Sequence, residues 1–475
     1  DYARRFDKHN VGGMLLYTQR EFKNNVLPSR NQGLSGRATY DYDQRYLFEF
    51  NFGYNGTERL GKGDRFEFFP AVSLGWLVSN EKFFEPLSDV VSSLKLRGSY
   101  GLVGSDETGP SNAPHFLYID QVQVTGNGRP GFTTGENLNV SYYGPVVQQW
   151  AVQNGGWERV KKLDVGFDME LFRELSITFD FFYDKRYNIL LHREAWPQSL
   201  GFHEAKPWSN KGKVDNWGYE VSTNWRKQFT KDLTVDFRGT FTYTQNKYID
   251  VDEPIYPYVW QTATGKPLNR RNGYIAEGLF QSQEEIDNSP TQNLGSKPMP
   301  GDIKYRDVDG NGVIDSKDQV MISKTANMPR IQYGFGVNID WKRFNFGVFF
   351  NGSAMRDINI NGLHPFGQND YNAMKFVAEN RWTEANPNPN AEYPRLGLND
   401  SQMSNNSQSS TYWIRNGNFL RFKTLEIGYR FDHVRLYFTG NNLAVFSPFK
   451  LWDPELGWNS YPLQRTFCIG AQLSF

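Results

Sequence analysis

The chain has 475 residues, of which 16% are aromatic, and its 52 Lys and Arg residues balance its 52 Asp and Glu residues. This balance excludes the basic surface of a general nucleic-acid binder, so no nucleic acid is expected as a partner. The absence of any run of about 18 apolar residues excludes a transmembrane helix, and the single cysteine, Cys468, excludes an internal disulfide framework.

Segments with a two-residue repeat predict β-strands along the whole chain. In residues 46–54 every even position is aromatic, while the odd positions are Leu, Glu, Asn and Gly. Side chains alternate between the two faces of a strand, so this pattern gives one aromatic face and one largely polar face. The same repeat recurs in 163–171, 175–183, 233–241, 331–341, 434–438 and 466–475. We expect about fourteen such strands.

Three features favour a membrane barrel over a soluble β-sandwich, whose strands alternate in the same way. Several segments reach the length of about 9–11 residues that a strand needs to cross a bilayer. An alternating strand also ends at the final residue, Phe475, as in outer-membrane barrel precursors. Finally, short and long connections alternate, as they do between the periplasmic turns and extracellular loops of outer-membrane barrels.

The connections can be assigned from the gaps between these strands. The expected tight turns are 43–44, 172–174, 228–231, 342–343 and 432–433. The expected long loops are 103–158, 188–212, 248–329, 353–418 and 444–465. Residues 80–92 are an exception, because they form a long connection on the side of the tight turns.

The sequence therefore predicts an all-β fold, a transmembrane antiparallel β-barrel over residues 1–475, in the outer membrane of a Gram-negative cell. The aromatic faces would meet lipid, because lipid cannot hydrogen-bond a backbone and only closed strand pairing survives there. The polar faces would line the interior. They carry charges of both signs, including Arg97, Asp164 and Asp168, which must be paired or hydrated.

A twelve-residue calcium-loop pattern occupies residues 307–318, which would lie outside the cell. Its liganding positions one, three, five, seven, nine and twelve are Asp307, Asp309, Asn311, Val313, Asp315 and Asp318. Gly312 supplies the turn at position six, and Val313 would bind through its carbonyl. We expect Ca²⁺ to stiffen the loop rather than to drive a sensor, because no helices flank it. The alternative is an Asx- and Gly-rich loop without an ion.

Aromatic residues in the long loops are the candidates for substrate contact. They are Trp150, Trp157, Trp196, Trp208 and Trp260. Their rings could stack on sugar faces or clamp peptide side chains, and the alternative is a role in loop packing or in the membrane-interface girdle.

No catalytic motif supports an enzyme. The strings GxSxG, HExxH, GxxxxGK[ST] and GxGxxG do not occur, and the closest histidines, His192 and His203, have a poor spacing for a metal. Glycoside hydrolysis needs only two carboxylates, so a secreted calcium-dependent glycoside hydrolase or carbohydrate-binding protein remains one alternative. A porin that acts alone is the other.

Seven phrases of the sequence resemble the SusC/RagA-like family, the TonB-dependent outer-membrane transporters of Bacteroidetes. They are FPAVSLGWLVSNEKFF (69–84), LKLRGSYGLVGSDE (94–107), WERVKKLDVGFDMELF (157–172), PGDIKYRDVDGNGVIDSKDQVMI (300–322), RWTEANPNPNAEYPRL (381–396), FLRFKTLEIGYRF (419–431) and GNNLAVFSPFKLWDPE (440–455). Together they cover nearly the whole chain.

The resemblance implies a barrel of 22 strands, a plug domain inside it and a SusD-like surface lipoprotein above it. It also implies energy from the TonB complex and a cargo of glycans or oligopeptides. No plug-like region or TonB-contacting segment precedes Asp1, and about fourteen strands leave about eight of the 22 unaccounted for, so the chain is expected to be the C-terminal part of such a transporter. The remaining strands, the plug and the TonB-contacting segment would then be partners. A cleavage product, a split subunit and a fragment of a longer chain remain open as explanations.

Overall fold

The computed structural model describes residues 1–23, 28–107, 115–124, 132–142, 144–152, 155–197, 207–326, 328–361, 374–397, 400–457 and 460–473. The chain forms two compact units. The first comprises Asp1–Asn224, Thr244–Ile255 and Ala263–Gly265, and the second comprises Trp225–Tyr243, Tyr256–Thr262 and Lys266–Phe475. Phe475 and His203, both named in the sequence-based predictions, lie outside the described residues.

One large sheet dominates the fold. Among the described residues its strand order is β1-β2-β3-β4-β5-β6-β11-β12-β13-β14-β21-β22-β25-β26-β27, fifteen strands where about fourteen were expected. The first unit contains β1 (Tyr2–Phe6), β2 (His9–Phe22), β3 (Ser29–Tyr42), β4 (Tyr46–Thr57), β5 (Phe66–Leu77), β6 (Val91–Ser105), β11 (Glu158–Leu171) and β12 (Leu175–His192). Strands β13 (Trp208–Thr230) and β14 (Leu233–Asp250) contribute residues to both units. The second unit adds β21 (Ile331–Trp341), β22 (Phe344–Ala354), β25 (Phe419–Arg430), β26 (Val434–Phe446) and β27 (Thr466–Leu473).

Small elements occupy the connections. Between β5 and β6 lie the 3₁₀ helices η1 (Val78–Asn80) and η2 (Lys82–Leu87), and between β6 and β11 lie β7 (Gln121–Gln123), β8 (Phe132–Thr134), β9 (Val140–Tyr142) and β10 (Val146–Gln149). Between β14 and β21 lie η4 (Val259–Gln261), β15 (Arg271–Gly273), β16 (Ala276–Leu279), α1 (Gln283–Asp287), β17 (Thr291–Gln292), β18 (Ile303–Tyr305), β19 (Val313–Ile314), η5 (Ser316–Asp318) and β20 (Val320–Ser323). Between β22 and β25 lie β23 (Asp357–Asn359), α2 (Lys375–Asn380), α3 (Asp400–Met403), η7 (Thr411–Trp413) and β24 (Ile414–Asn416).

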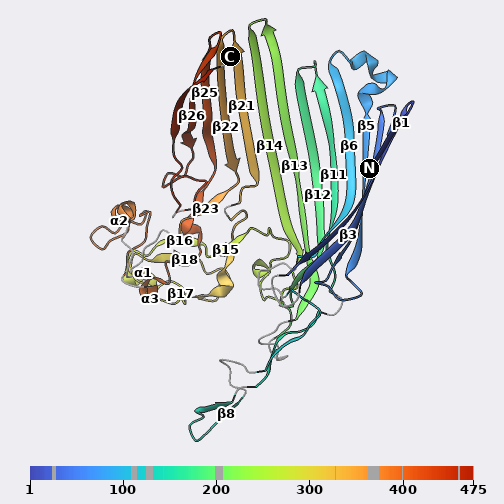
Figure 1. Cartoon of the computed structure of the whole chain (residues 1–475). Coiled ribbons are helices and arrows are strands. Elements are labelled where there is room, and N and C mark those ends of the chain that lie inside the picture. The colour runs from blue at the N-terminus through green and yellow to red at the C-terminus, as the bar shows by residue number, and fades with distance from the viewer. Residues whose placement is uncertain are drawn as a thin grey trace. The chain divides into compact units, whose positions relative to one another are not determined.

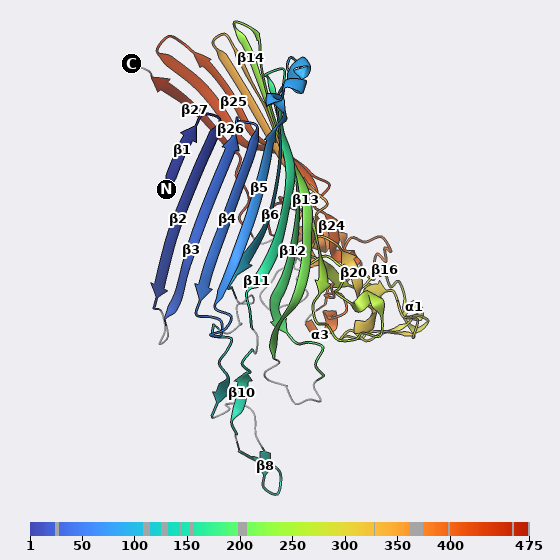
Figure 2. The same ribbon diagram turned by 90° about the vertical axis from the view of Figure 1, so that its right-hand side faces the viewer.

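Within each unit, tight turns lie at one end of the strands and the long connections at the other (Figures 1 and 2). At the β3–β4 turn, Asp43 and Gln44 both have φ of +53°. Positive φ at both central residues is typical of hairpin turns whose twist matches that of the strands. One predicted turn was misplaced. It lies at 231–232 rather than 228–231, because β13 continues to Thr230.

Several strands also extend beyond their predicted ends. Strands β12, β13 and β14 have 18, 23 and 18 residues, so they reach into the predicted loops 188–212 and 248–329. The alternation fades there because neither face has to match lipid, whereas pairing with the neighbouring strand continues.

The aromatic faces of the sheet are exposed, as expected for lipid contact. On β5 the side chains of Phe68 and Leu74 are 47% and 60% exposed. Such a continuous apolar surface is unusual for a protein in water and marks a membrane or partner surface. Among the described residues, no helix is long and apolar enough to cross a membrane.

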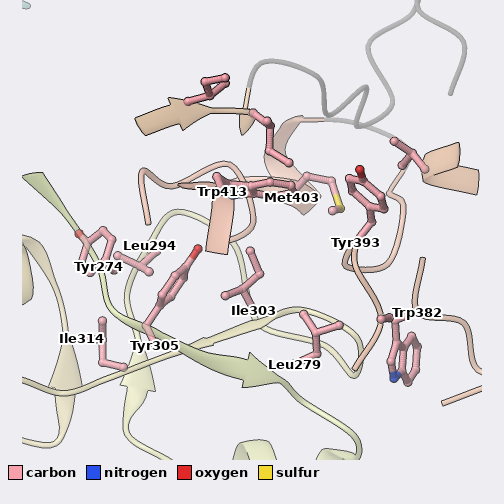
Figure 3. Close-up of a cluster of buried hydrophobic side chains, with 14 of the residues drawn as sticks. Tyr274, Leu279, Leu294, Ile303, Tyr305, Ile314, Trp382, Tyr393, Met403 and Trp413 are labelled. Carbon is pink, nitrogen blue, oxygen red and sulfur yellow. The ribbon is translucent and has the colours of Figure 1, made fainter. Parts of the chain in front are cut away.

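The hydrophobic core of the first unit combines residues of the connections with residues of the sheet strands β5, β12 and β13, whereas the core of the second unit lies in the connections. In the first unit the core residues are Leu60, Phe69, Leu117, Val152, Trp157, Leu190 and Trp208. In the second unit the core includes Tyr274, Leu294, Ile303, Tyr305, Ile314, Trp382, Tyr393, Met403, Trp413 and Phe449, most of which Figure 3 shows. We call the described residues of 256–262, 266–330, 355–418 and 447–465 the loop module. It is a small packed domain built from three connections.

Candidate functional site

The predicted calcium loop lies inside the loop module and is fixed at both ends. Strand β18 leads into it, and β19 within it pairs with β17 through Gln292 and Ile314. Ile314, the apolar eighth position of the loop, is completely buried in the module core. The calcium loop is therefore packed into the loop module and is not an isolated surface loop.

Three of its carboxylates converge. Asp307, Asp309 and Asp318 each offer an oxygen, and these oxygens lie within 4.8 Å of one another. Asp318 is completely buried, and its carboxylate accepts hydrogen bonds from the backbone N–H groups of Val308 at 2.7 Å and Asp315 at 2.9 Å. Hard oxygen donors at this spacing fit the coordination that Ca²⁺ prefers.

Backbone N–H groups also hold Asp307 in its charged form. Burial raises the pKa of this carboxyl, but hydrogen bonds from Gly312 and Gly310, both 2.8 Å long, outweigh burial and lower the pKa below its ordinary value. Both glycines have positive φ, +74° for Gly310 and +82° for Gly312, which allows the chain to turn around the carboxylates.

The other predicted ligands have different roles in this geometry. The Asp315 side chain accepts from the N–H of Lys317 at 2.7 Å and caps η5, so it does not join the three clustered carboxylates. Position nine of such loops often binds through water, which is compatible with this arrangement. The amide oxygen of Asn311 accepts from the N–H of Val313 at 2.7 Å, and Val313 is exposed.

A stacked aromatic pair rests on the calcium loop. The rings of Tyr258 and Trp260 are 4.4 Å apart and nearly parallel, at 7°. The Trp260 indole donates to the carbonyl of Lys317 at 2.8 Å. The Tyr258 hydroxyl donates to Asp309, and this hydrogen bond raises the pKa of the phenol. The loop thus positions one predicted contact residue, Trp260.

The other predicted tryptophans differ in accessibility. Trp157 and Trp208 are only 5% and 8% exposed, because both pack in the core of the first unit. Trp150 is 41% exposed, and Trp196 is half-buried beneath the guanidinium of Arg193. Trp150, Trp196 and Trp260 therefore keep ring surface that a ligand could reach.

In the first unit, the polar face of the sheet is lined with paired charges. Arg97 lies 2.5 Å from Asp180 and 3.2 Å from Asp168. Arg97 reaches Asp180 past Gly166, which is opposite both residues in the strand register. A Cβ at Gly166 would lie 2.5 Å from a carboxylate oxygen of Asp180, so glycine is needed at this crossing. A cavity of about 740 Å³ in the first unit is lined by charged residues of this face, including Arg97 and Asp164.

A buried polar network within the loop module was not predicted from the sequence. The carboxylate of Asp302 is completely buried, lies 2.6 Å from the Arg395 guanidinium and accepts from Asn406 at 2.8 Å. Burial raises the pKa of Asp302, although Arg395 opposes the shift. Asn405 adjoins this group and bonds Gln292 at 2.6 Å. No short-range pattern marks these contacts, because the partners lie about a hundred residues apart.

No protein-family model matches the chain. It is 26% identical to the TonB-dependent receptor P3 of Formosa agariphila over 93% of its length, and 27% identical to the TonB-dependent receptor SusC of Bacteroides thetaiotaomicron over 93%. These matches cover 45% and 43% of those proteins, so the chain spans about half the length of its curated relatives. Their names are those of receptors, not enzymes.

Solved structures agree in fold. The RagAB peptide transporter matches 100% of the chain with a TM-score of 0.73 and 19% identity, over 54% of its own chain. The RagAB peptide importer in its open-open state matches 99% with a TM-score of 0.72 and 20% identity, over 53% of its own chain. The predicted family resemblance and the predicted outer-membrane barrel fold are confirmed.

Proposed function

This chain is a relative of the SusC/RagA-like TonB-dependent receptors of the outer membrane, and we propose on that premise that it forms the barrel portion of an energy-coupled importer. Its cargo would be oligosaccharides or oligopeptides, captured together with a SusD-like surface lipoprotein. The similarity to TonB-dependent receptors along 93–95% of the chain is the observation that carries the proposal. The paired charges around Arg97 support it, because they suit a hydrated path for polar cargo.

The two cargo classes follow from different relatives. One curated relative is SusC, and two of the solved structures that match the chain are of the RagAB peptide transporter or importer. The partly accessible rings of Trp150, Trp196 and Trp260 would stack on sugars or clamp peptide side chains equally well. The cargo therefore has to be identified from the transporter itself.

The experiment compares energised with passive uptake. The full-length transporter is returned to a deletion strain, and entry of fluorescent oligosaccharides and of a labelled peptide mixture is measured with and without an uncoupler of the proton gradient. An importer coupled to TonB loses uptake of its cargo when the uncoupler is added. Uptake that continues unchanged would contradict the proposal and favour a porin. Mass spectrometry of the transporter purified from outer membranes would identify the lipoprotein partner and any trapped ligand.

We also propose that residues 307–318 bind Ca²⁺. Asp307, Asp309 and Asp318 would supply carboxylate oxygens, with Asn311, the Val313 carbonyl and Asp315 completing the shell directly or through water. The ion would offset the repulsion between the clustered carboxylates and stiffen the loop beneath Tyr258 and Trp260.

Calcium titration of the purified full-length transporter tests this assignment. We expect Asp318→Asn to weaken binding by at least tenfold, while Asp287→Asn, a matched change on α1 outside the loop, leaves binding unchanged. Chelation should loosen residues 300–322 in hydrogen exchange and leave the barrel strands protected. A well-ordered loop that takes up no ion at millimolar calcium would refute the site.

A further inference from the structure

The connection between β5 and β6 is unlike the other turns on its side of the sheet. Neighbouring turns there, such as 43–45 and 172–174, are short, whereas residues 78–90 fold into η1 and η2 (Figures 1 and 2). The import function proposed above does not explain why residues 78–90 are longer than the neighbouring turns.

Glu81, between the two 3₁₀ helices, ties the segment to the sheet. Its carboxylate accepts from the Tyr46 hydroxyl at 2.7 Å, from the Trp76 indole at 3.1 Å and from Arg45 at 3.1 Å. The hydrogen bonds from Tyr46 and Trp76 lower the pKa of Glu81 below its ordinary value, so the anchor stays charged. A further bond runs from the Asn80 amide to the carbonyl of Gln44 at 2.7 Å.

These anchors show which face of the sheet the segment joins. Tyr46 and Trp76 are directly opposite each other in the β4–β5 register, and Trp76 is opposite Leu96 on β6. All three lie on the aromatic face that meets lipid, at its tight-turn end. Phe83 packs edge-on against Trp76 with ring centroids 6.4 Å apart. The segment therefore continues the lipid-facing surface at the level where aromatic girdles meet the headgroups.

The segment presents its own apolar side chains outward. Phe83, Leu87 and Val90 are 66%, 54% and 48% exposed, while Val78 and Phe84 are buried and hold the fold. We propose that residues 78–90 lie in the headgroup–acyl boundary of the membrane on the tight-turn side, where Phe83 and Leu87 insert into lipid. Lipid is the occupant because the patch is continuous with a surface already in lipid. Short amphipathic segments of this kind bury their apolar face only about 5–10 Å into the boundary.

Spin-label accessibility tests the proposal. Cys468, the one cysteine of this chain, and any cysteine elsewhere in the full-length transporter are first replaced by serine, and nitroxide labels are then attached to Phe83→Cys and Leu87→Cys. The control labels are at Asp89→Cys in the same segment and Arg173→Cys in a neighbouring turn. The protein is reconstituted in vesicles of phosphatidylethanolamine and phosphatidylglycerol, and collision with oxygen is compared with collision with a water-soluble nickel chelate.

We expect the ratio of oxygen to nickel collisions to be severalfold higher at positions 83 and 87 than at 89 and 173. Equal nickel access at all four positions would overturn the proposal. Loss of both kinds of collision only after addition of periplasmic extract would also overturn it, because a protein would then cover the patch. A label at Val90→Cys provides an independent position if one variant folds poorly. The outcome does not depend on which cargo is imported.

Discussion

Breaking the buried ion pair between Asp302 and Arg395 should make the loop module open more often. In Arg395→Met, the completely buried Asp302 carboxylate keeps the Asn406 amide and the Met299 N–H at 2.8 and 2.9 Å but loses its counter-charge. Removing one partner of a buried pair costs about 3–5 kcal/mol. We expect the lower end, because Asp302 can take up a proton. About 3 kcal/mol corresponds to a rise on the order of 100-fold in the open population of the module.

The penalty should depend on pH with a definite sign. The pKa of Asp302 is already raised by burial, and loss of Arg395 would raise it further. A carboxyl whose pKa is higher in the folded state destabilises the fold at neutral pH, and this cost disappears as pH falls through the raised pKa. The difference between Arg395→Met and the wild type should therefore shrink on acidification.

Hydrogen exchange of the peptide that contains Ile303 and Tyr305 is the assay, because both N–H groups donate to buried side chains of the network. The double variant Asp302→Asn/Arg395→Met is the control and should recover most of the protection, since no charge remains buried. The reasoning would be refuted if this peptide exchanged in Arg395→Met at the wild-type rate at neutral pH. It would also be refuted if the loss of protection in Arg395→Met did not change with pH.

Three further predictions follow from burial and ion pairing. Trp157→Ala should destabilise the first unit by about 3–5 kcal/mol in denaturant unfolding, because the residue is 5% exposed. Trp150→Ala should cost clearly less, because Trp150 is 41% exposed, and equal effects would contradict the assigned core. Arg421→Lys should speed proteolysis of residues 447–457. The Arg421 guanidinium lies 2.6 Å from Asp453 and 2.7 Å from Glu455, and a lysine ammonium cannot bind both carboxylates in the same geometry. An unchanged cleavage rate would contradict the role of Arg421 as an anchor of this segment. Calcium removal should shift the fluorescence of Trp260. A spectrum that does not change on chelation would contradict the proposal that the ion stiffens the loop beneath the Tyr258–Trp260 stack.

The strands and their faces were predictable from the sequence. A strand repeats every two residues, so an aromatic side and a polar side can be read from segments such as 46–54 without knowing their neighbours. The turn at 43–44 and the liganding pattern of 307–318 were equally local, because all their residues belong to one short stretch. The ends of the strands were predicted less well. Strand β13 continues past its predicted limits because backbone pairing with the neighbouring strand extends beyond the residues that alternate.

Tertiary structure alone decided which polar and aromatic side chains are buried. Trp157 and Trp150 look alike in sequence, yet only Trp157 finds Phe69 across the first unit, in edge contact at 5.3 Å. The role of Asp302 depends on its ion pair with Arg395, and the role of Glu81 depends on its hydrogen bonds with two lipid-facing aromatic residues that precede it. Burial and ion pairing are sums over contacts from segments far apart in the chain. A sequence pattern records the spacing along one segment, so it fixes which way a side chain faces but not what it meets.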